Sequence, residues 1–129
     1  MTIEMSMLLW SVVLGLVQIA IAAAGSVSQR GLVWAAGARD VPPKPLTGVV
    51  ARLSRASANF LETFPFFVPL VLAAYVLQRH DSMTMLGAQL YFWARLVYLP
   101  VYAAGIPYLR TLVWAVSLVG IVLVLVALF

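Results

Sequence analysis

The stretch MLLWSVVLGLVQIAIAAAG, from Met7 to Gly25, contains no charged residue and decides the class of this protein. A helix needs about 20 mainly apolar residues to cross the hydrocarbon core of a bilayer, and this run has that length. It differs from a secretory signal because no basic region precedes it, Glu4 being the only charged residue before Met7, and because its apolar part is too long. We therefore expect a membrane-spanning helix that is retained.

The composition of the chain indicates the same class. Of its 129 residues, 64% are hydrophobic and only 9% are charged, more apolar surface than a soluble domain of this length could bury. The absence of cysteine excludes disulfides and thiolate sites, and a single histidine, His80, argues against a metal centre. The net charge of +4 is explained better by the basic loops of a membrane protein than by binding to nucleic acid.

Four apolar segments follow one another along the chain, over about residues 5–28, 49–77, 83–104 and 108–129. Each is long enough to span a bilayer as a helix, the form that pairs its own backbone groups in lipid. The first connection is long and rich in proline and glycine, which predicts an extended loop. The other two are short, so the segments they join run antiparallel. The sequence thus predicts one all-α integral membrane domain, residues 1–129, folded as an up-and-down four-helix bundle.

The distribution of basic residues predicts how this bundle is oriented. They gather around the first connection, at Arg30, Arg39, Lys44, Arg52 and Arg55, and Arg110 flanks the third connection. The opposite side has few basic residues. By the positive-inside rule, we expect both chain ends outside and the first and third connections in the cytoplasm.

Polar residues enter the apolar segments at helical spacing. In RASANFLETFPFF, Arg55 to Phe67, the residues Arg55, Asn59 and Glu62 lie four and three positions apart and therefore share one helix face. The third and fourth segments carry comparable faces, formed by Arg95, Tyr98 and Tyr102 and by Arg110 and Trp114.

These faces converge in one half of the bilayer. Glu62 and Arg95 each lie ten residues from the cytoplasmic end of their segment, a depth of about 15 Å at 1.5 Å per residue. Because a charge in hydrocarbon costs several kcal/mol unless it is paired, we expect a Glu62–Arg95 ion pair. Arg55 and Arg110 remain as surplus cations, and the other half of the bilayer is nearly featureless. Since guanidinium groups bind carboxylates, the pattern predicts a basic pocket for an anionic ligand.

Structural roles are open alternatives for the same residues. Arg55 could extend to the lipid interface, and Asn59 could be a hydrogen bond between helices. Glu62 and Arg95 could be a pair without any ligand. Tyr98 and Tyr102 could serve packing as readily as binding.

The run RASANFLETFPFF resembles the second-helix signature of the MAPEG family, the membrane-associated proteins in eicosanoid and glutathione metabolism. In that signature an arginine is followed by Asn and then Glu at this spacing. The segment ARLVYLPVYAAGIPYLRTLVW, Ala94 to Trp114, is similar to the third-to-fourth helix segment of bacterial members. The resemblance extends over essentially the whole chain.

This resemblance implies a homotrimer in a bacterial inner membrane, with glutathione bound as co-substrate between subunits near the cytoplasmic side. Arg110 resembles the arginine that stabilises the glutathione thiolate and is the expected catalytic residue. The implied binding residues are Arg30, Arg55, Asn59, Glu62, Arg95, Tyr98, Tyr102 and Trp114. The implied activity is a transferase or peroxidase that acts, without a metal, on lipophilic electrophiles arriving through the bilayer.

Two other functions compete with this one. A small multidrug-type transporter can also have four spans, but carriers of cationic drugs depend on an acid in the first span, and the first segment here has none. A non-catalytic membrane scaffold would bind no small anion, so no such ligand would raise its thermal stability.

Overall fold

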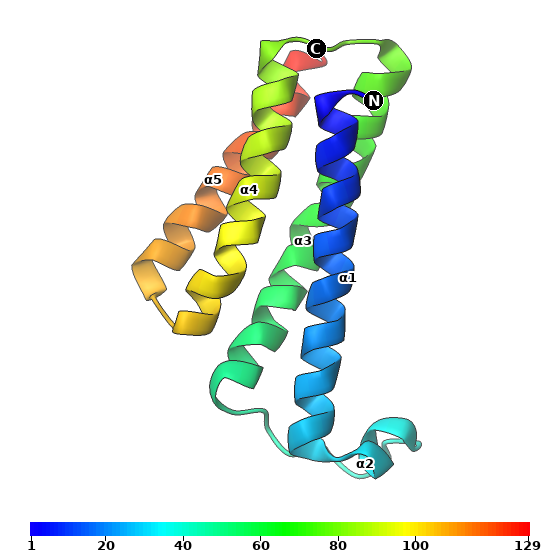
Figure 1. Ribbon diagram of the computed structural model, residues 1–129, viewed down its shortest axis with the longest axis vertical. Coiled ribbons are helices and arrows are strands. Elements are labelled where there is room, and N and C mark those ends of the chain that lie inside the picture. Colours follow the sequence, from blue (N-terminus) through cyan, green and yellow to red (C-terminus); the bar gives the residue numbers. More distant parts are fainter.

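The computed structural model describes all residues, 1–129, and is helical throughout, which confirms the all-α prediction. Its helices are α1 (Ile3–Arg30), α2 (Leu32–Ala36), α3 (Gly48–Leu77), α4 (Ser82–Ala104) and α5 (Pro107–Ala127). The four long helices lie side by side, and α2 is a short helix beyond the end of α1 (Figure 1). Both chain ends and the α3–α4 link lie at one end of the molecule, and the other two links lie at the opposite end (Figure 1).

The long helices coincide closely with the predicted segments, but two details differ from expectation. The first connection is not extended throughout, because Leu32–Ala36 forms α2. Moreover, only α1, α3 and α5 are long and apolar enough to be identified as membrane spans. The remaining long helix, α4, has the length of a span but carries Gln89, Arg95 and several tyrosines, which lower its hydropathy.

Local signals explain where the helices begin and end. The side chain of Thr2 accepts a hydrogen bond from the backbone N–H of Met5, 3.2 Å away, and so caps α1. Asp81 and Thr84 form a capping box at the start of α4, which satisfies two backbone donors at once. Gly105 ends α4 at φ 75°, a conformation that favours glycine. Pro107 then starts α5, where a missing N–H costs nothing.

Glycines allow the helices to pack closely at two places. At the α4–α5 crossing, a Cβ atom on Gly120 would lie 2.5 Å from the carbonyl oxygen of Gly87 and 2.7 Å from the backbone nitrogen of Tyr91. In α1, a Cβ atom on Gly15 would lie 2.8 Å from the ring of Phe60 in α3. Such close backbone approach supplies the dispersion contacts that hold helices together in lipid, where hydrophobic burial contributes little.

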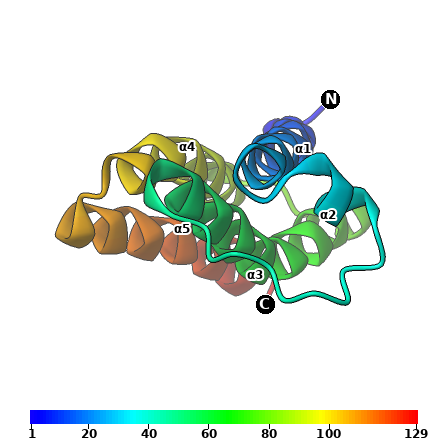
Figure 2. The same cartoon turned by 90° about the horizontal axis from the view of Figure 1, so that it is seen from below.

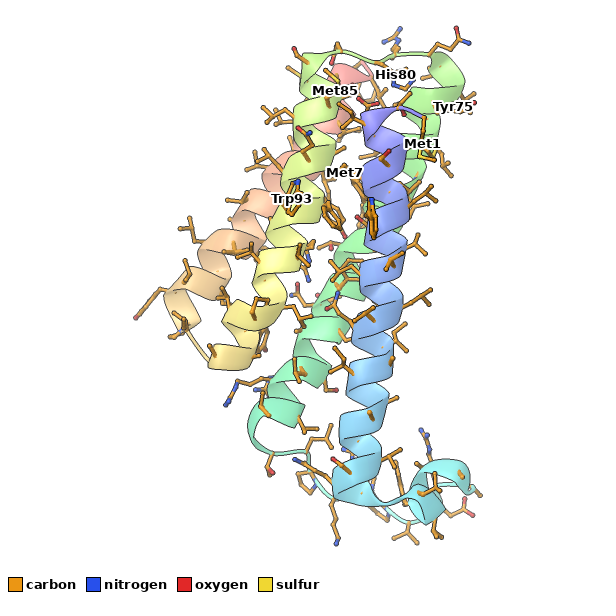
Figure 3. All side chains as sticks on the ribbon, in the orientation of Figure 1. Met1, Met7, Tyr75, His80, Met85 and Trp93 are labelled. Carbon is orange, nitrogen blue, oxygen red and sulfur yellow. The ribbon has the colours of Figure 1, made fainter.

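The end that carries both termini, here named the closed end, is not featureless as expected. Glu4 is 1% exposed, and its Oε2 lies 3.1 Å from Nδ1 of His80 in the α3–α4 link. Its other oxygen, Oε1, accepts a hydrogen bond of 3.1 Å from the hydroxyl of Thr84. Figure 3 shows His80 above the first turn of α1. One carboxylate therefore joins the start of α1 to the start of α4.

The opposite end, here named the open end, is uneven. The helices α1 and α3 extend well beyond the link between α4 and α5 (Figure 1). Seen from below, α2 and the chain that follows it swing out to one side of the helices (Figure 2). Arg52 connects α3 to the end of α4 here: its Nε donates a hydrogen bond of 2.9 Å to the carbonyl oxygen of Ala103.

Candidate functional site

A buried arginine on α4 is the centre of the polar residues at the open end. Arg95 is 1% exposed, and its Nη1 donates a hydrogen bond of 2.8 Å to Oδ1 of Asn59 on α3. The guanidinium lies 4.2 Å from the ring centroid of Tyr98, one helical turn further along α4. This spacing puts the two side chains on the same face, where the aromatic ring stabilises the cation.

Hydrogen bonding around Arg95 is incomplete. Only four buried side-chain nitrogen or oxygen atoms in the molecule lack a hydrogen-bond partner, and three of them are Nε and Nη2 of Arg95 and the hydroxyl of Tyr98. The fourth is Nε2 of Gln18 in α1. A buried polar atom without a partner costs about 1–3 kcal/mol, more for a charged group. Because such atoms are rare in folded proteins, their concentration at one place makes it a candidate binding site.

Two further arginines meet at the ring of Tyr102. Nε of Arg55 on α3 donates a hydrogen bond of 3.0 Å to the hydroxyl of Tyr102. The guanidinium carbon of Arg110 on α5 lies 5.0 Å from the same ring. The ring of Tyr98 packs edge-on against it, with centroids 5.5 Å apart. Three helices thus hold the three cations around a pair of tyrosines, as the helix faces in the sequence predicted.

A small cavity opens beside this cluster. It measures about 270 Å³ and is lined by Asn59, Arg110, Thr111 and Trp114. The sequence predicted all of these as site residues except Thr111. Its position next to Arg110, in the first turn of α5, could have indicated it. The volume is slightly below the usual range for small-molecule sites, about 300–1,000 Å³.

A larger groove of about 460 Å³ lies between α1 and α4 and is apolar. Its lining includes Met7 and Trp93, labelled in Figure 3. Since all of its lining residues are hydrophobic, it offers nothing that would bind an anion. The polar cavity at the open end is therefore the better candidate for the site.

One expected ion pair is not formed, and one expected residue, Arg30, lies apart from the cluster. Glu62 is exposed and forms no ion pair, because the only ion pair within the chain joins Glu4 and His80. Asn59 takes the place that Glu62 was expected to fill beside Arg95. Arg30 contacts the α1–α3 connection instead: its Nε donates a hydrogen bond of 2.7 Å to the carbonyl oxygen of Lys44.

The arrangement favours binding of an anion with more than one charged or polar group. Arg95, Arg55 and Arg110 present guanidinium groups from three helices, and none of them is paired with a carboxylate within the chain. Guanidinium groups bind carboxylates in fork geometry, and a dry surrounding strengthens each such contact.

Comparisons with known proteins agree with this architecture at the level of the family. Searches among curated proteins and among solved structures return no match. A family model does match, and it covers residues 7–129, nearly the whole chain. By this match, the protein belongs to the MAPEG family.

Proposed function

We propose that this protein is a homotrimeric, membrane-embedded transferase or peroxidase that uses glutathione, and that the open end binds the thiol. Family membership and the unpaired guanidinium groups support the proposal together. The observation that carries it is Arg95, a buried cation with two nitrogen atoms that have no acceptor. An anionic ligand supplies the missing acceptors and so removes the cost of leaving these atoms unbonded.

Glutathione has the groups that this set of residues can bind. It carries two carboxylates, which suit Arg55 and Arg95, and one ammonium group, which suits the exposed carboxylate of Glu62. Asn59 and the hydroxyl of Tyr98 add neutral polar contacts.

A neighbouring subunit completes the site, because the cavity within one chain is small and Arg55 and Glu62 are exposed. In the trimer, Arg30 of one subunit contributes to the site of the next. This arrangement also removes the charge of Glu62 from contact with lipid, where an unpaired carboxylate is costly.

Arg110 activates the thiol. A free thiol has a pKa of about 8.5 and is mostly protonated at neutral pH. The guanidinium of Arg110 stabilises the thiolate, and the proton leaves to water. The thiolate sulfur then bonds to the electrophilic carbon of a lipophilic substrate, and the leaving group takes the electron pair of the broken bond. With a hydroperoxide, the sulfur attacks the terminal oxygen and the O–O bond breaks, and the released alkoxide takes a proton from water to leave as an alcohol. A second glutathione then converts the sulfenic product to a disulfide and releases water.

Thiolate absorbance during a titration with glutathione tests the role of Arg110. We expect the wild-type protein to produce the signal and Arg110→Ala to lose it by about tenfold or more, since one pKa unit corresponds to a factor of ten. Arg79→Ala is the matched control, because Arg79 lies at the closed end and bonds the carbonyl oxygen of Leu128. An unchanged signal in Arg110→Ala, with the same oligomeric state, refutes the role.

A thermal-stability measurement tests ligand binding itself. A ligand that binds only the native state raises the melting temperature. Glutathione should therefore stabilise the wild-type protein, whereas a scaffold without a site would show no shift. This experiment requires no electrophilic substrate.

A further inference from the structure

The connection between α1 and α3, residues 31–47, has a defined structure of its own and is here named the α2 loop. Two guanidinium groups contact the ring of Trp34 in α2: its centroid lies 5.3 Å from the guanidinium carbon of Arg30 and 4.9 Å from that of Arg39. Its Nε1 donates a hydrogen bond of 2.8 Å to the carbonyl oxygen of Val41. Arg39 also donates two bonds to the carbonyl oxygen of Ala35, which closes α2.

Apolar side chains of the α2 loop face outward. Leu32 is 67% exposed, Val33 91% and Val41 70%. No other part of the chain covers them, and α2 is far too short to span a membrane. Exposure of such a group of apolar side chains to water would be unfavourable. What surrounds the α2 loop therefore decides the cost of exposing them.

The lengths of the helices indicate that the α2 loop lies outside the hydrocarbon core. At 1.5 Å per residue, α1 with 28 residues is about 42 Å long, and α5 with 21 residues is about 32 Å long. The hydrocarbon core is about 30 Å thick, so α5 matches it. At the closed end, α5 ends slightly above the start of α1 (Figure 1). The additional length of α1, about 10 Å by the same rise, therefore emerges at the open end, where α2 follows it.

The α2 loop is also basic. It carries Arg39 and Lys44 against Asp40 as its only acid, and neither Asp40 nor Lys44 forms an ion pair. The side chain of Lys44 makes no hydrogen bond within the chain, since only its carbonyl oxygen is bonded. A hollow of about 540 Å³ on the loop is lined by residues that include Trp34, Arg39 and Asp40. Cationic groups thus border an exposed apolar surface beyond the end of α1.

We propose that the α2 loop is a docking surface for anionic phospholipid in the leaflet around the open end. The lipid phosphate lies against Arg39 and Lys44, and Leu32 and Val33 enter the boundary between headgroups and acyl chains. Basic residues near an anionic membrane surface attract it, and apolar side chains add burial. A free phosphate would use the cations but not the exposed apolar side chains, so the lipid is the occupant that fits both.

The full-length protein in detergent tests this proposal in the absence of glutathione. Its melting temperature is followed during titration with phosphatidylglycerol and, separately, with phosphatidylcholine. We expect phosphatidylglycerol to raise the midpoint at concentrations where phosphatidylcholine does not, because it binds the native state. Lys44→Gln should weaken this apparent affinity about fivefold, as one basic residue at a membrane surface contributes about 1 kcal/mol. Raising the salt concentration should weaken it as well.

Controls separate the alternatives. Arg79→Gln removes a positive charge at the closed end and should respond as the wild type does. Arg39→Gln should respond as Lys44→Gln does. If it fails to fold, Lys44→Gln still decides the question, because that side chain has no partner in the chain. Equal stabilisation by the two lipids, an unchanged Lys44→Gln variant, or a full effect from inorganic phosphate would each overturn the proposal. None of these outcomes bears on glutathione binding, which is measured separately.

Discussion

The two ends of this molecule differ in whether their buried polar and charged groups have partners. At the closed end, each buried polar group has a partner: Glu4 contacts both His80 and Thr84, and Thr84 in turn belongs to the cap of α4. At the open end, Arg95 and Tyr98 are as deeply buried as Glu4 but leave donors unused. The comparison teaches that burial alone does not mark a site. Several buried donors without partners at one place are a stronger indication of a candidate site, because folding gains nothing from leaving them unbonded.

The largest loss of stability is expected at the crossing of α4 and α5, because these two helices contribute to both ends of the molecule. Gly120→Ala places a Cβ atom 2.5 Å from the backbone of Gly87, so α4 and α5 must separate. We expect a loss of about 3 kcal/mol or more in the free energy of unfolding, at the upper range for overpacking. Val119→Leu, which enlarges an exposed neighbour, is the control. Melting in detergent measures both, and equal stability of the two variants would show that the crossing can relax.

A smaller effect is expected from breaking the closed end alone. Glu4→Ala removes the ion pair with His80 and the hydrogen bond from Thr84. We expect the protein to lose about 1–3 kcal/mol of stability, the range for buried polar groups left without partners. Glutathione binding, measured by calorimetry, should stay unchanged. A loss of binding equal to that in a variant of the open end would abolish the distinction between the two ends.

The smallest effect on stability should come from the open end. Arg95→Met replaces a buried, incompletely bonded cation by an apolar side chain of similar length. Removing an incompletely bonded buried cation is favourable, whereas the lost hydrogen bond to Asn59 costs about 1 kcal/mol, so the melting temperature should stay within a few degrees. The same variant should lose glutathione binding. If it is strongly destabilised and glutathione still binds, Arg95 has the structural role and not the binding one.

The sequence predicted the long helices and, for most of their polar residues, the level along the helices at which they meet. Runs of apolar residues and the glycine and proline at positions 105 and 107 define the helix limits directly. Spacing along a helix also gives depth, and the residues expected at one depth do meet around Tyr98 and Tyr102.

The remaining features depend on direction around the helix axis and on distant contacts. Glu62 was expected to pair with Arg95, but Asn59, three residues earlier and about 60° away around the same face of α3, contacts Arg95 instead and Glu62 stays exposed. The contact of Glu4 with Thr84 joins residues 80 positions apart, which no local pattern encodes. Similarly, α2 depends on cation–ring contacts between Trp34 and its two arginines, and such contacts need the folded loop.

The ring of Tyr102 links two cations that come from different helices. Because Arg55 holds its hydroxyl and Arg110 lies near the ring, a change at either arginine alters the surroundings of the other. Substitutions at the two positions should therefore be energetically coupled, so their combined effect will differ from the sum of the single effects. The helices α3 and α5 are thereby joined through a shared aromatic side chain of α4. A change in one of these helices is therefore expected to affect the other.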